Sequence, residues 1–409
     1  MRVLLVHNYY RYFGGEDMAA DNDFQLLASH GIDVRRYTRH NREILEYSPW
    51  DKAMFPVRAI HSHETVESLD DALRDFPADV AYIHNVYPLI SPSIYTALAR
   101  REVPVVQVLH DYRPFCANGW LYTQGSACER CTGGRHWHAV IHKCMHQSRT
   151  ISAIYAASLW NLKRSGAFDR ISMFLCPSEF SRRLAIKNGI EPARLRVRPH
   201  SIDARDIATG TGPGEYFLYL GRISREKGLN TLLRAFERLP NAPLWIAGAG
   251  PMEAEVLGRL SEPGMRHVRM LGFQAGEAKL NLLRNARAVI VPSESLESFG
   301  LTVLEAFAAG RPVIASDAGA LPYLVEDGIT GLIFPRLDAE GLRSRVVHLL
   351  ENPAAAMRMG RQARLRAEQE YGPDTGFERL ITILTEARET ASEPAGAEET
   401  QREKHAAAI

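Results

Sequence analysis

The stretch Pro292–Arg311, PSESLESFGLTVLEAFAAGR, is the most informative part of this sequence for the fold. It follows a short apolar run, Ala288–Val291, whose β-branched residues are typical of a buried parallel strand. A polar loop comes next, and then a helical pattern from Leu301 to Ala309 that Gly310 ends. A strand, a polar turn and a helix in this order indicate an α/β unit with a ligand site at the start of the helix.

Two carboxylates flank this expected site. Glu297 lies in the loop and Glu305 lies eight positions later inside the helix. Gly300 allows the backbone to approach a ligand closely, and the start of the helix offers unpaired N–H groups and a positive dipole end. The alternative is a surface helix with two solvated glutamates, which leaves the rest of the string unexplained.

The string resembles the E-x7-E signature of retaining nucleotide-sugar glycosyltransferases, specifically glycosyltransferase family 4. The residues that fill the signature are Glu297, Ser298, Phe299, Gly300, Glu305, Ala306, Ala308, Gly310 and Pro312–Ala315. The resemblance implies that Glu297 holds hydroxyls of the donor sugar, that Glu305 holds the ribose hydroxyls, and that the segment from Ser298 to Leu301 contacts the donor. A carboxylate suits this role because it can accept two hydrogen bonds from a vicinal diol.

Length and composition set the class of protein. A chain of 409 residues is expected to form two domains. A net charge of +1 favours no strongly charged partner, and no nucleic-acid partner is expected. No apolar run approaches the ~20 residues of a membrane span. Five cysteines without a recognisable export signal indicate a reducing compartment, so the expected location is the cytoplasm, with the inner face of the membrane as a further option.

The N-terminal segment predicts the first Rossmann-like unit. Val3–His7 is typical of a strand and Glu16–Ala28 of a helix, with Gly14 and Gly15 in the loop between them. The loop lacks G-x-G-x-x-G, so no nicotinamide cofactor is expected. In the family that the chain resembles, a Gly-Gly-x-Glu loop lies over the donor diphosphate and the acceptor; here Glu16 comes one position early. The alternative is an ordinary tight turn.

His110 follows the predicted strand that begins at Val103. Open α/β sheets bind ligands at the carboxyl ends of their strands. A single histidine at such a place is more often structural than functional. The resemblance, however, implies that His110 meets the sugar or phosphates of the donor and faces the acceptor.

A cysteine-rich insertion is expected at about residues 112–147. Cys128 and Cys131 have the C-x-x-C spacing of a tetrahedral zinc site, and Cys116 and Cys144 lie on either side of them. A similar insertion occurs in a subset of the family that the chain resembles. The prediction is a structural zinc ion bound by the four cysteines, and the alternative is a set of reduced, buried thiols. Nearby histidines that could also serve as ligands are His136, His138, His142 and His146.

The second domain is expected to open with the strand Tyr216–Leu220, followed by GRISREKG at residues 221–228. The resemblance implies that Arg222 and Lys227 bind the diphosphate of the donor. A diphosphate leaving group needs fixed positive charge as the glycosidic bond breaks. Two solvated cations at the start of a helix would oppose the helix dipole, which makes that alternative less favourable.

Further positions complete the expected donor site. Gly248 ends the strand that begins at Leu244, close to the expected nucleotide. Phe273 belongs to the segment Val268–Gln274, which in the family that the chain resembles lines the base pocket. The segment His200–Asp203 departs from the Asn-Gly-Ile-Asp or Asn-Pro-Val-Asp that is usual there in the family that the chain resembles, which leaves its turn geometry open.

The resemblance extends over about residues 1–389 and implies an α/β fold of the GT-B type, with two Rossmann-like parallel-sheet domains that face each other across a cleft. The expected parts are an acceptor domain (1–205), a donor domain (206–372), a helix that crosses back to the first domain (373–389) and a disordered tail (390–409). The expected function is a retaining hexosyltransferase that moves a sugar from a nucleotide diphosphate sugar to a glycan or lipid-linked acceptor in cell-surface polysaccharide biosynthesis. The alternatives are a nucleotide-sugar epimerase of the same fold and a non-catalytic binding protein.

No cofactor is expected for catalysis, because Arg222 and Lys227 supply the positive charge and the site residues include no D-x-D motif. No carboxylate is placed as a covalent nucleophile, so front-face attack assisted by the leaving phosphate is the expected route to retention. A predicted helix from Ser148 to Arg170 has an apolar side, Trp160 and a basic end, and it predicts peripheral membrane contact. Packing on the protein's own core is the alternative.

Overall fold

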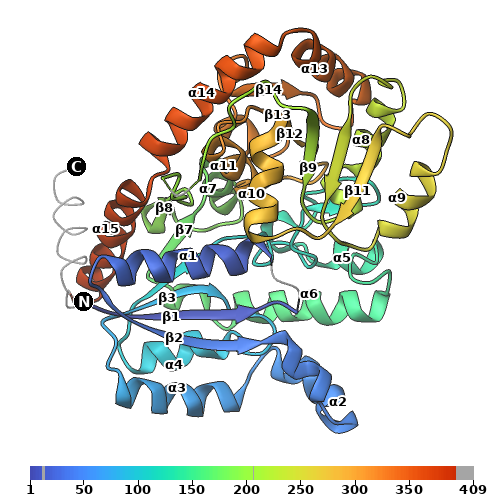
Figure 1. Cartoon of the computed structure of the whole chain (residues 1–409). Helices are drawn as coiled ribbons and strands as arrows, with labels where there is room; N and C mark the ends of the chain where they lie inside the picture. Colours follow the sequence, from blue (N-terminus) through green and yellow to red (C-terminus); the bar gives the residue numbers. More distant parts are fainter. Residues whose placement is uncertain (12–13, 206, 393–409) are drawn as a thin grey trace, which may run out of the picture.

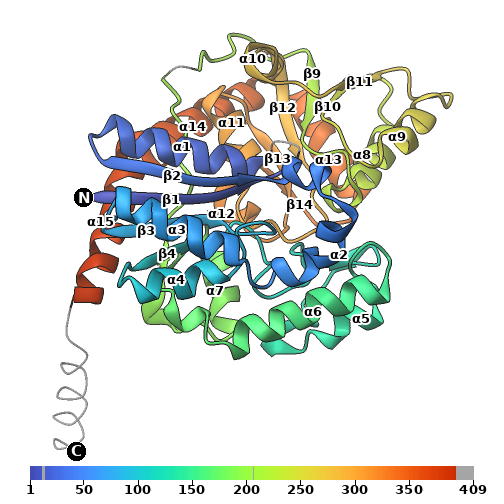
Figure 2. The same ribbon diagram turned by 90° about the horizontal axis from the view of Figure 1, so that it is seen from below.

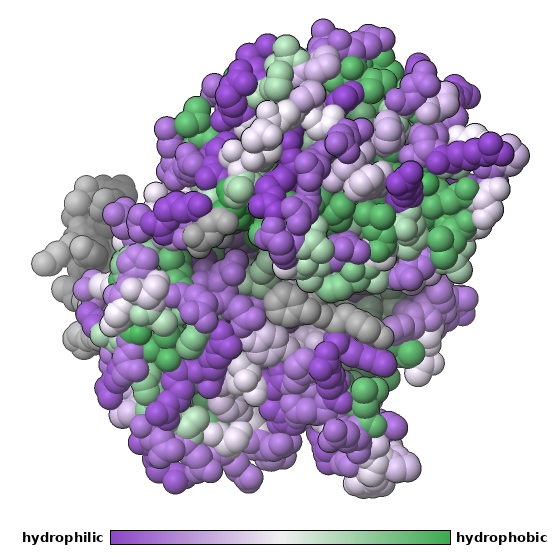
Figure 3. Space-filling model, in the orientation of Figure 1, coloured by the Kyte–Doolittle hydropathy of each residue, from purple (hydrophilic) through white to green (hydrophobic). Residues whose placement is uncertain are grey.

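The computed structural model describes residues 1–11, 14–205 and 207–392. Two parallel sheets of six strands each form the centres of two domains, and helices cover both faces of each sheet (Figure 1). This confirms the predicted α/β architecture with two Rossmann-like domains. The surface seen in Figure 3 is mostly hydrophilic, with smaller apolar patches between the charged side chains.

The first sheet has the strand order β2-β1-β3-β4-β7-β8. Its strands are β1 (Arg2–Tyr9), β2 (Asp33–His40), β3 (Val80–Asn85), β4 (Val105–Val108), β7 (Met173–Cys176) and β8 (Leu195–Val197). The helices of this part are α1 (Gly15–Ser29), α2 (Pro49–Arg58), α3 (His63–Asp75), α4 (Ser93–Arg100), α5 (Trp137–Ile141), α6 (Arg149–Arg164) and α7 (Glu179–Lys187). The inner strands are apolar and fully buried, as a parallel sheet covered on both faces requires. The edge strand β2 carries mostly polar, partly exposed residues, and its sequence accordingly shows no apolar run.

The second sheet has the order β11-β10-β9-β12-β13-β14. Its strands are β9 (Tyr216–Leu220), β10 (Leu244–Ala247), β11 (Val268–Gly272), β12 (Ala286–Val291), β13 (Val313–Ser316) and β14 (Gly331–Phe334). The helices that follow these strands are α8 (Leu229–Phe236), α9 (Glu253–Leu260), α10 (Gly276–Asn285), α11 (Leu301–Ala308), α12 (Leu321–Leu324), α13 (Ala339–Glu351) and α14 (Pro353–Glu370). One apolar core joins α8, α9 and α13 to the sheet, and a second core lies under α10 and α11 on the opposite face.

The last helix, α15 (Pro373–Ser392), returns to the first domain (Figure 1). Leu380, Ile383 and Leu384 are buried in one cluster with the side chains of β1, β3 and β4. The helix includes residues 390–392, which the sequence analysis assigned to a disordered tail. The rest of that predicted tail, residues 393–409, lies outside the described residues.

The insertion between β4 and α6 departs from regular α/β alternation. It holds the short hairpin of β5 (Tyr122–Thr123) and β6 (Ser126–Ala127) and the helix α5. The helix predicted from Ser148 to Arg170 is shorter than expected: α6 ends at Arg164, and Gly166 with φ +66° turns the chain into a separate 3-10 turn at Phe168–Arg170. A left-handed backbone at Gly166 is incompatible with a continuing α-helix, which explains the error.

Candidate active site

The loop between β12 and α11 places Glu297 beside Lys227. Lys227 Nζ donates to Glu297 Oε1 at 2.7 Å, and Ser293 Oγ donates to the same oxygen. Burial by itself would raise the pKa of Glu297, but the Lys227 ammonium and the Ser293 hydroxyl together hold this pKa below its usual range. Glu297 is therefore a charged carboxylate held in a largely buried place, as a hydroxyl-binding residue requires.

Close backbone contacts fix this loop to the loop after β9. Gly228 has φ +78°, and a Cβ at this position would lie 1.8 Å from the carbonyl oxygen of Pro292. The backbone N–H groups of Glu294 and Ser295 donate to the carbonyl oxygen of Glu226 at 2.9 Å and 3.0 Å. The sequence GRISREKG thus positions both its own cations and the loop that carries Glu297.

Arg222 lies between a carboxylate and an aromatic ring. Its Nη2 donates to Glu226 Oε1 at 2.6 Å, and its Cζ lies 4.9 Å from the centre of the Trp120 ring. Burial raises the pKa of Glu297, and the charge of Arg222 helps to lower it, after the larger contributions of Lys227 and Ser293. The two predicted phosphate-binding cations, Arg222 and Lys227, therefore act on the same small region, and the side chain of Arg222 is 45% exposed.

Glu305 is bound by a lysine that belongs to none of the sequence motifs. Lys279 Nζ, from α10, donates to Glu305 Oε1 at 2.7 Å. The side chain of Glu305 is 11% exposed. Each of the two signature glutamates therefore carries a lysine partner.

Two helix starts from different domains meet at this region. Gly300 precedes α11 with φ +138°, a backbone conformation that favours glycine. Gly15 begins α1, and a Cβ there would lie 3.2 Å from the side chain of Leu301. The backbone at Gly15 thus packs directly against the start of α11, so the N-termini of the two helices lie close together.

His110 joins the two domains. Ser298 Oγ donates to the backbone carbonyl oxygen of His110 at 2.5 Å, and Ser178 Oγ donates to the carbonyl oxygen of Ser298 at 2.7 Å. Nε2 of His110 lies 2.8 Å from Nδ1 of His84. The His110 ring stacks on the His200 ring, with 5.2 Å between the ring centres. Burial and then the neighbouring His200 lower the pKa of His110, so its ring is neutral at neutral pH.

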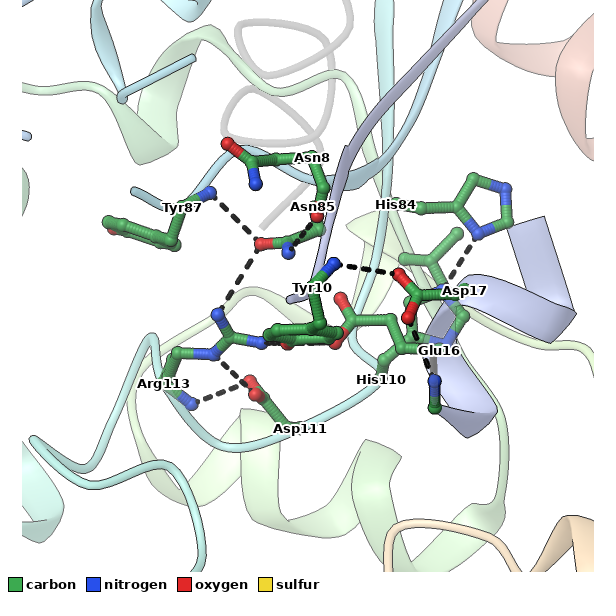
Figure 4. A network of polar contacts seen from close by, with 12 residues as sticks. Asn8, Tyr10, Glu16, Asp17, His84, Asn85, Tyr87, His110, Asp111 and Arg113 are labelled. Carbon is green, nitrogen blue, oxygen red and sulfur yellow. Dashed lines mark hydrogen bonds and ion pairs between the residues drawn. The ribbon is translucent and has the colours of Figure 1, made fainter. Parts of the chain in front are cut away.

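A polar network around Arg113 lies next to His110 on the first domain (Figure 4). Arg113 donates to Asp111 and, at 3.0 Å, to Glu16 Oε2, and Tyr10 OH donates to the same carboxylate. Burial raises the pKa of Asp111 to about 7, and burial followed by Asp111 and Asp17 raises the pKa of Glu16. The acid that follows the two glycines therefore faces Arg113.

The other predicted donor residues have different surroundings. Gly248 has φ +155°, and a Cβ there would lie 1.8 Å from the carbonyl oxygen of Gly221, so glycine keeps the ends of β10 and β9 close together. Phe273 follows β11 and is 65% exposed. Phe299 is buried, with its ring 5.0 Å from His200, so its side chain packs between the domains rather than toward a ligand.

The four predicted zinc ligands line one cavity. Cys116, Cys128, Cys131 and Cys144 surround a space of about 10 Å³ together with His138 and His142. Burial, and next the neighbouring Cys116 and Cys144, raise the pKa of Cys131 to about 12. The thiols nevertheless have other partners: Cys116 donates to Asn118 Oδ1 at 3.1 Å and Cys144 to Thr123 Oγ1 at 3.7 Å.

Within residues 1–11, 14–205 and 207–392, no three or more His, Cys, Asp or Glu side chains are arranged to hold a metal ion. The cysteines are thus gathered in one place but are not in a ligand arrangement, and the zinc site stays a prediction. The kind and number of donors fit tetrahedral zinc.

A second cavity, of about 430 Å³, opens beside the loop that carries Glu297. Phe180 of the first domain lines it together with Leu296 and Tyr323 of the second domain. Gly319 forms part of its wall and packs against the backbone of Glu297. The loop that carries Glu297 therefore has open space between the domains on this side.

Two family models together cover most of the chain. The model described as "Glycosyltransferase Family 4" matches residues 24–206, and the model described as "Glycosyl transferases group 1" matches residues 205–366. The boundary between the two matches falls between the two parallel sheets.

The curated relatives are glycosyltransferases. A glycogen synthase of Mycobacterium tuberculosis is 30% identical over 330 residues, which cover 78% of this chain and 72% of the relative. The O-antigen chain mannosyltransferase C of Escherichia coli is 31% identical over 223 residues, or 54% of this chain and 60% of the relative.

Solved structures with the same fold include nucleotide-sugar complexes. Anabaena HepE in complex with UDP has a TM-score of 0.66 at 18% identity, with 94% of this chain and 100% of that chain covered. The sucrose-phosphate synthase of Thermosynechococcus elongatus has a TM-score of 0.71 at 19% identity, with 94% and 98% covered. Identities this low support the fold alone.

Proposed function

The chain belongs to the GT-B glycosyltransferases, and we propose that it transfers a sugar from a nucleoside diphosphate sugar with retention of anomeric configuration. The observation that carries this proposal is the contact of Lys227 with Glu297, 2.7 Å long, with Arg222 beside it and His110 opposite. A cation pair and a charged carboxylate in one place suit a substrate that joins a diphosphate to a sugar diol.

In this proposal each residue has one role. Arg222 and Lys227 bind the diphosphate and stabilise the negative charge that grows as the glycosidic bond breaks. Glu297 accepts hydrogen bonds from hydroxyls of the donor sugar, and Glu305 accepts them from the ribose. The departing phosphate oxygen takes the proton of the acceptor hydroxyl, which attacks from the same face of the sugar.

The donor class has support in the related folds. HepE has been solved with UDP and with UDP-glucose. In this chain the two helix starts near Gly15 and Gly300 offer further N–H groups to a diphosphate. A nucleoside diphosphate sugar is therefore the donor that we propose.

We propose a glycan or lipid-linked acceptor, used in building cell-surface polysaccharide. The helices α5 and α6 lie side by side at the edge of the first domain (Figure 2). Exposed apolar side chains on these two helices include Trp137, Ile141 and Trp160, and Arg164 lies over the Trp160 ring at 5.1 Å. Aromatic and basic side chains together suit contact with anionic headgroups, which would bring a lipid-linked acceptor to the first domain. Among the described residues, no helix is both long and apolar enough to cross a bilayer.

We also propose that the four cysteines bind one structural zinc ion. The insertion contains two strands of two residues each and a five-residue helix, so it has little core of its own. A metal ion would stabilise such a segment, and four thiolates would leave no coordination position open for catalysis.

A donor screen tests the proposed function. Purified protein is incubated with common nucleotide sugars and simple glycan acceptors, release of nucleoside diphosphate is measured, and the anomeric configuration of the product is read by NMR. Donor turnover without any acceptor would favour an epimerase. Binding of nucleoside diphosphate without turnover of any donor would favour a binding protein. An inverted product would overturn the retaining mode.

A further inference from the structure

Three consecutive residues of the cysteine-rich insertion, Trp120, Leu121 and Tyr122, contact the second domain. The ring of Trp120 lies 4.9 Å from Cζ of Arg222. Tyr122 OH donates to Glu294 Oε2 at 2.8 Å. Leu121 is buried in a small apolar cluster against which Leu296 packs. We call these three residues segment 120–122.

Within the insertion, hydrogen bonds of Asn118 fix the position of segment 120–122. Asn118 Oδ1 accepts hydrogen bonds from Cys116 Sγ at 3.1 Å and from the backbone N–H of Trp120 at 3.0 Å. Asn118 Nδ2 donates to the carbonyl oxygen of Tyr122 at 2.8 Å. The backbone N–H of Cys128 donates to the carbonyl oxygen of Leu121 at 2.7 Å. The position of the segment is therefore tied to two of the four cysteines.

Glycine is required beside this segment. Gly119 has φ +74°, and a Cβ there would lie 2.8 Å from Cγ of Arg113. The turn thus fits tightly against the polar network that contains Arg113 and Asp111. Segment 120–122 is consequently held between the Arg113 network of the first domain and the loop after β9 that carries Arg222.

The contacts of the second domain form a continuous series that begins and ends at residues of the insertion. Glu294 accepts from Tyr122 and, on its other oxygen, from Thr231 Oγ1 at 2.8 Å. The backbone N–H of Glu294 donates to the carbonyl oxygen of Glu226, whose carboxylate accepts from Arg222 at 2.6 Å. The contact of Arg222 with the Trp120 ring completes this series at the insertion.

We propose that Trp120 and Tyr122 are positioning residues that hold the Arg222 guanidinium ready for the diphosphate of the donor. The inference rests on the proposed function, because it assigns Arg222 to the phosphates. A guanidinium placed over an aromatic face keeps its charge and loses few of its hydrogen-bond donors. It is also ordered before the ligand arrives, so less conformational entropy is lost when the phosphates bind. The acceptor domain thereby contributes to phosphate binding on the donor domain.

The experiment compares nucleoside diphosphates with monophosphates. Calorimetry measures the affinities of wild type for UDP and UMP, GDP and GMP, and ADP and AMP, and the pair that binds most tightly is used for the variants. We expect Trp120→Ala to lower the diphosphate affinity by roughly threefold to tenfold and to leave the monophosphate affinity unchanged. Tyr122→Phe should act in the same direction, and Trp120→Phe should restore most of the loss. Trp50→Ala, an exposed tryptophan on α2, is the control.

The outcomes separate this inference from the proposed function. Equal losses of diphosphate and monophosphate affinity in Trp120→Ala, or affinities equal to those of Trp50→Ala, would overturn the positioning role while leaving the glycosyltransferase in place. The same two outcomes in Tyr122→Phe would overturn the positioning role of Tyr122. This variant removes only the hydroxyl group, so it is expected to keep the fold. Failure of wild type to bind any nucleoside diphosphate would overturn the proposed function and this inference with it.

Discussion

Lys227 and Glu297 come from different loops, after β9 and after β12, and meet at 2.7 Å in a largely buried place. Taking a lysine and a carboxylate out of water is costly unless each finds a partner, and here each is the partner of the other. A donor would bring its diphosphate to Lys227 and its sugar hydroxyls to Glu297. In the proposed function, the pair keeps both charges in position until the substrate arrives.

Removal of either cation should slow the reaction strongly. We expect Arg222→Ala and Lys227→Ala each to lower turnover by ~10²-fold or more with the fold intact, as loss of one preorganised charge at a transition state typically does. Steady-state kinetics on the cognate donor measures the effect. Arg234→Ala, an exposed cation on α8, should retain normal rates. Near-normal rates for both site variants would remove the diphosphate assignment.

The two signature glutamates should differ in what they affect. Glu305→Gln should mainly weaken nucleotide binding, because its proposed contact is with the ribose. Glu297→Gln should also reduce the rate, since it loses both the sugar contact and the charge that positions Lys227. Calorimetry with the nucleoside diphosphate alone, set beside kcat on the complete donor, distinguishes the two. Equal effects of both changes on both quantities would contradict the assignment.

Local sequence patterns were sufficient to predict the α/β architecture. The apolar strands and the glycines that end them are short-range signals, so the strand of β9 was predicted with its observed bounds. The edge strand β2 escaped prediction because its exposed residues carry no apolar pattern. The end of α6 was placed too late, at Arg170, because Gly166 was not recognised as the helix stop that its positive φ makes it.

The site was only partly accessible from sequence. The residues of the signature string lie together because they are neighbours in the chain. Lys279, Trp120 and His84 belong to no motif, and they reach the site only through the packing of distant segments. Phe299 shows the converse error of prediction from a motif: it lies inside the signature, but its side chain packs against His200 instead of contacting a ligand.

Acid should weaken the fold through His200. Burial lowers the pKa of His200 to about 4, with Arg198 acting in the same direction and Asp23 opposing it. An unfolded histidine has a pKa of about 6.5. His200 therefore stabilises the folded state fully above about pH 6.5, and this contribution falls as pH drops toward about 4, where the folded form protonates too.

The change His200→Asn removes this titration. Urea unfolding at pH 7.5 and pH 5 should show a smaller loss of unfolding free energy for the variant than for wild type. His348→Asn, an exposed histidine on α13, should leave the loss unchanged. Identical pH dependence of wild type and His200→Asn would contradict the prediction.

The cysteine cavity should hold zinc. Elemental analysis of protein purified without added metal should show about one zinc per chain, because four thiolates around one small space satisfy a tetrahedral ion. Cys131→Ser should lose the metal and lower the melting temperature, whereas Cys176→Ala, in strand β7 outside the cavity, should retain the metal. Metal-free wild type whose four insertion thiols all titrate under native conditions would refute the site.

The first domain should bind anionic membranes reversibly. Arg164 lies over the exposed Trp160 at 5.1 Å, and Lys163 and Arg170 add positive charge near the same end of α6. Each cation close to an anionic surface contributes about 1 kcal/mol, and salt screens this attraction. We expect flotation with anionic liposomes at low salt that decreases at high salt, and a clear loss of flotation for the Lys163, Arg164 and Arg170 charge-removal variant.

A matched variant tests whether liposome binding depends on the cations near α6 or only on the net charge of the protein. Replacement of Arg234, Arg358 and Arg361 by glutamine removes the same number of charges from exposed positions on the second domain, and it should leave flotation unchanged. Neutral liposomes should bind weakly, because the tryptophans alone bury little area in a bilayer. Equal flotation with neutral and anionic lipid, or none with either, would argue that the acceptor reaches the enzyme from solution rather than from a membrane.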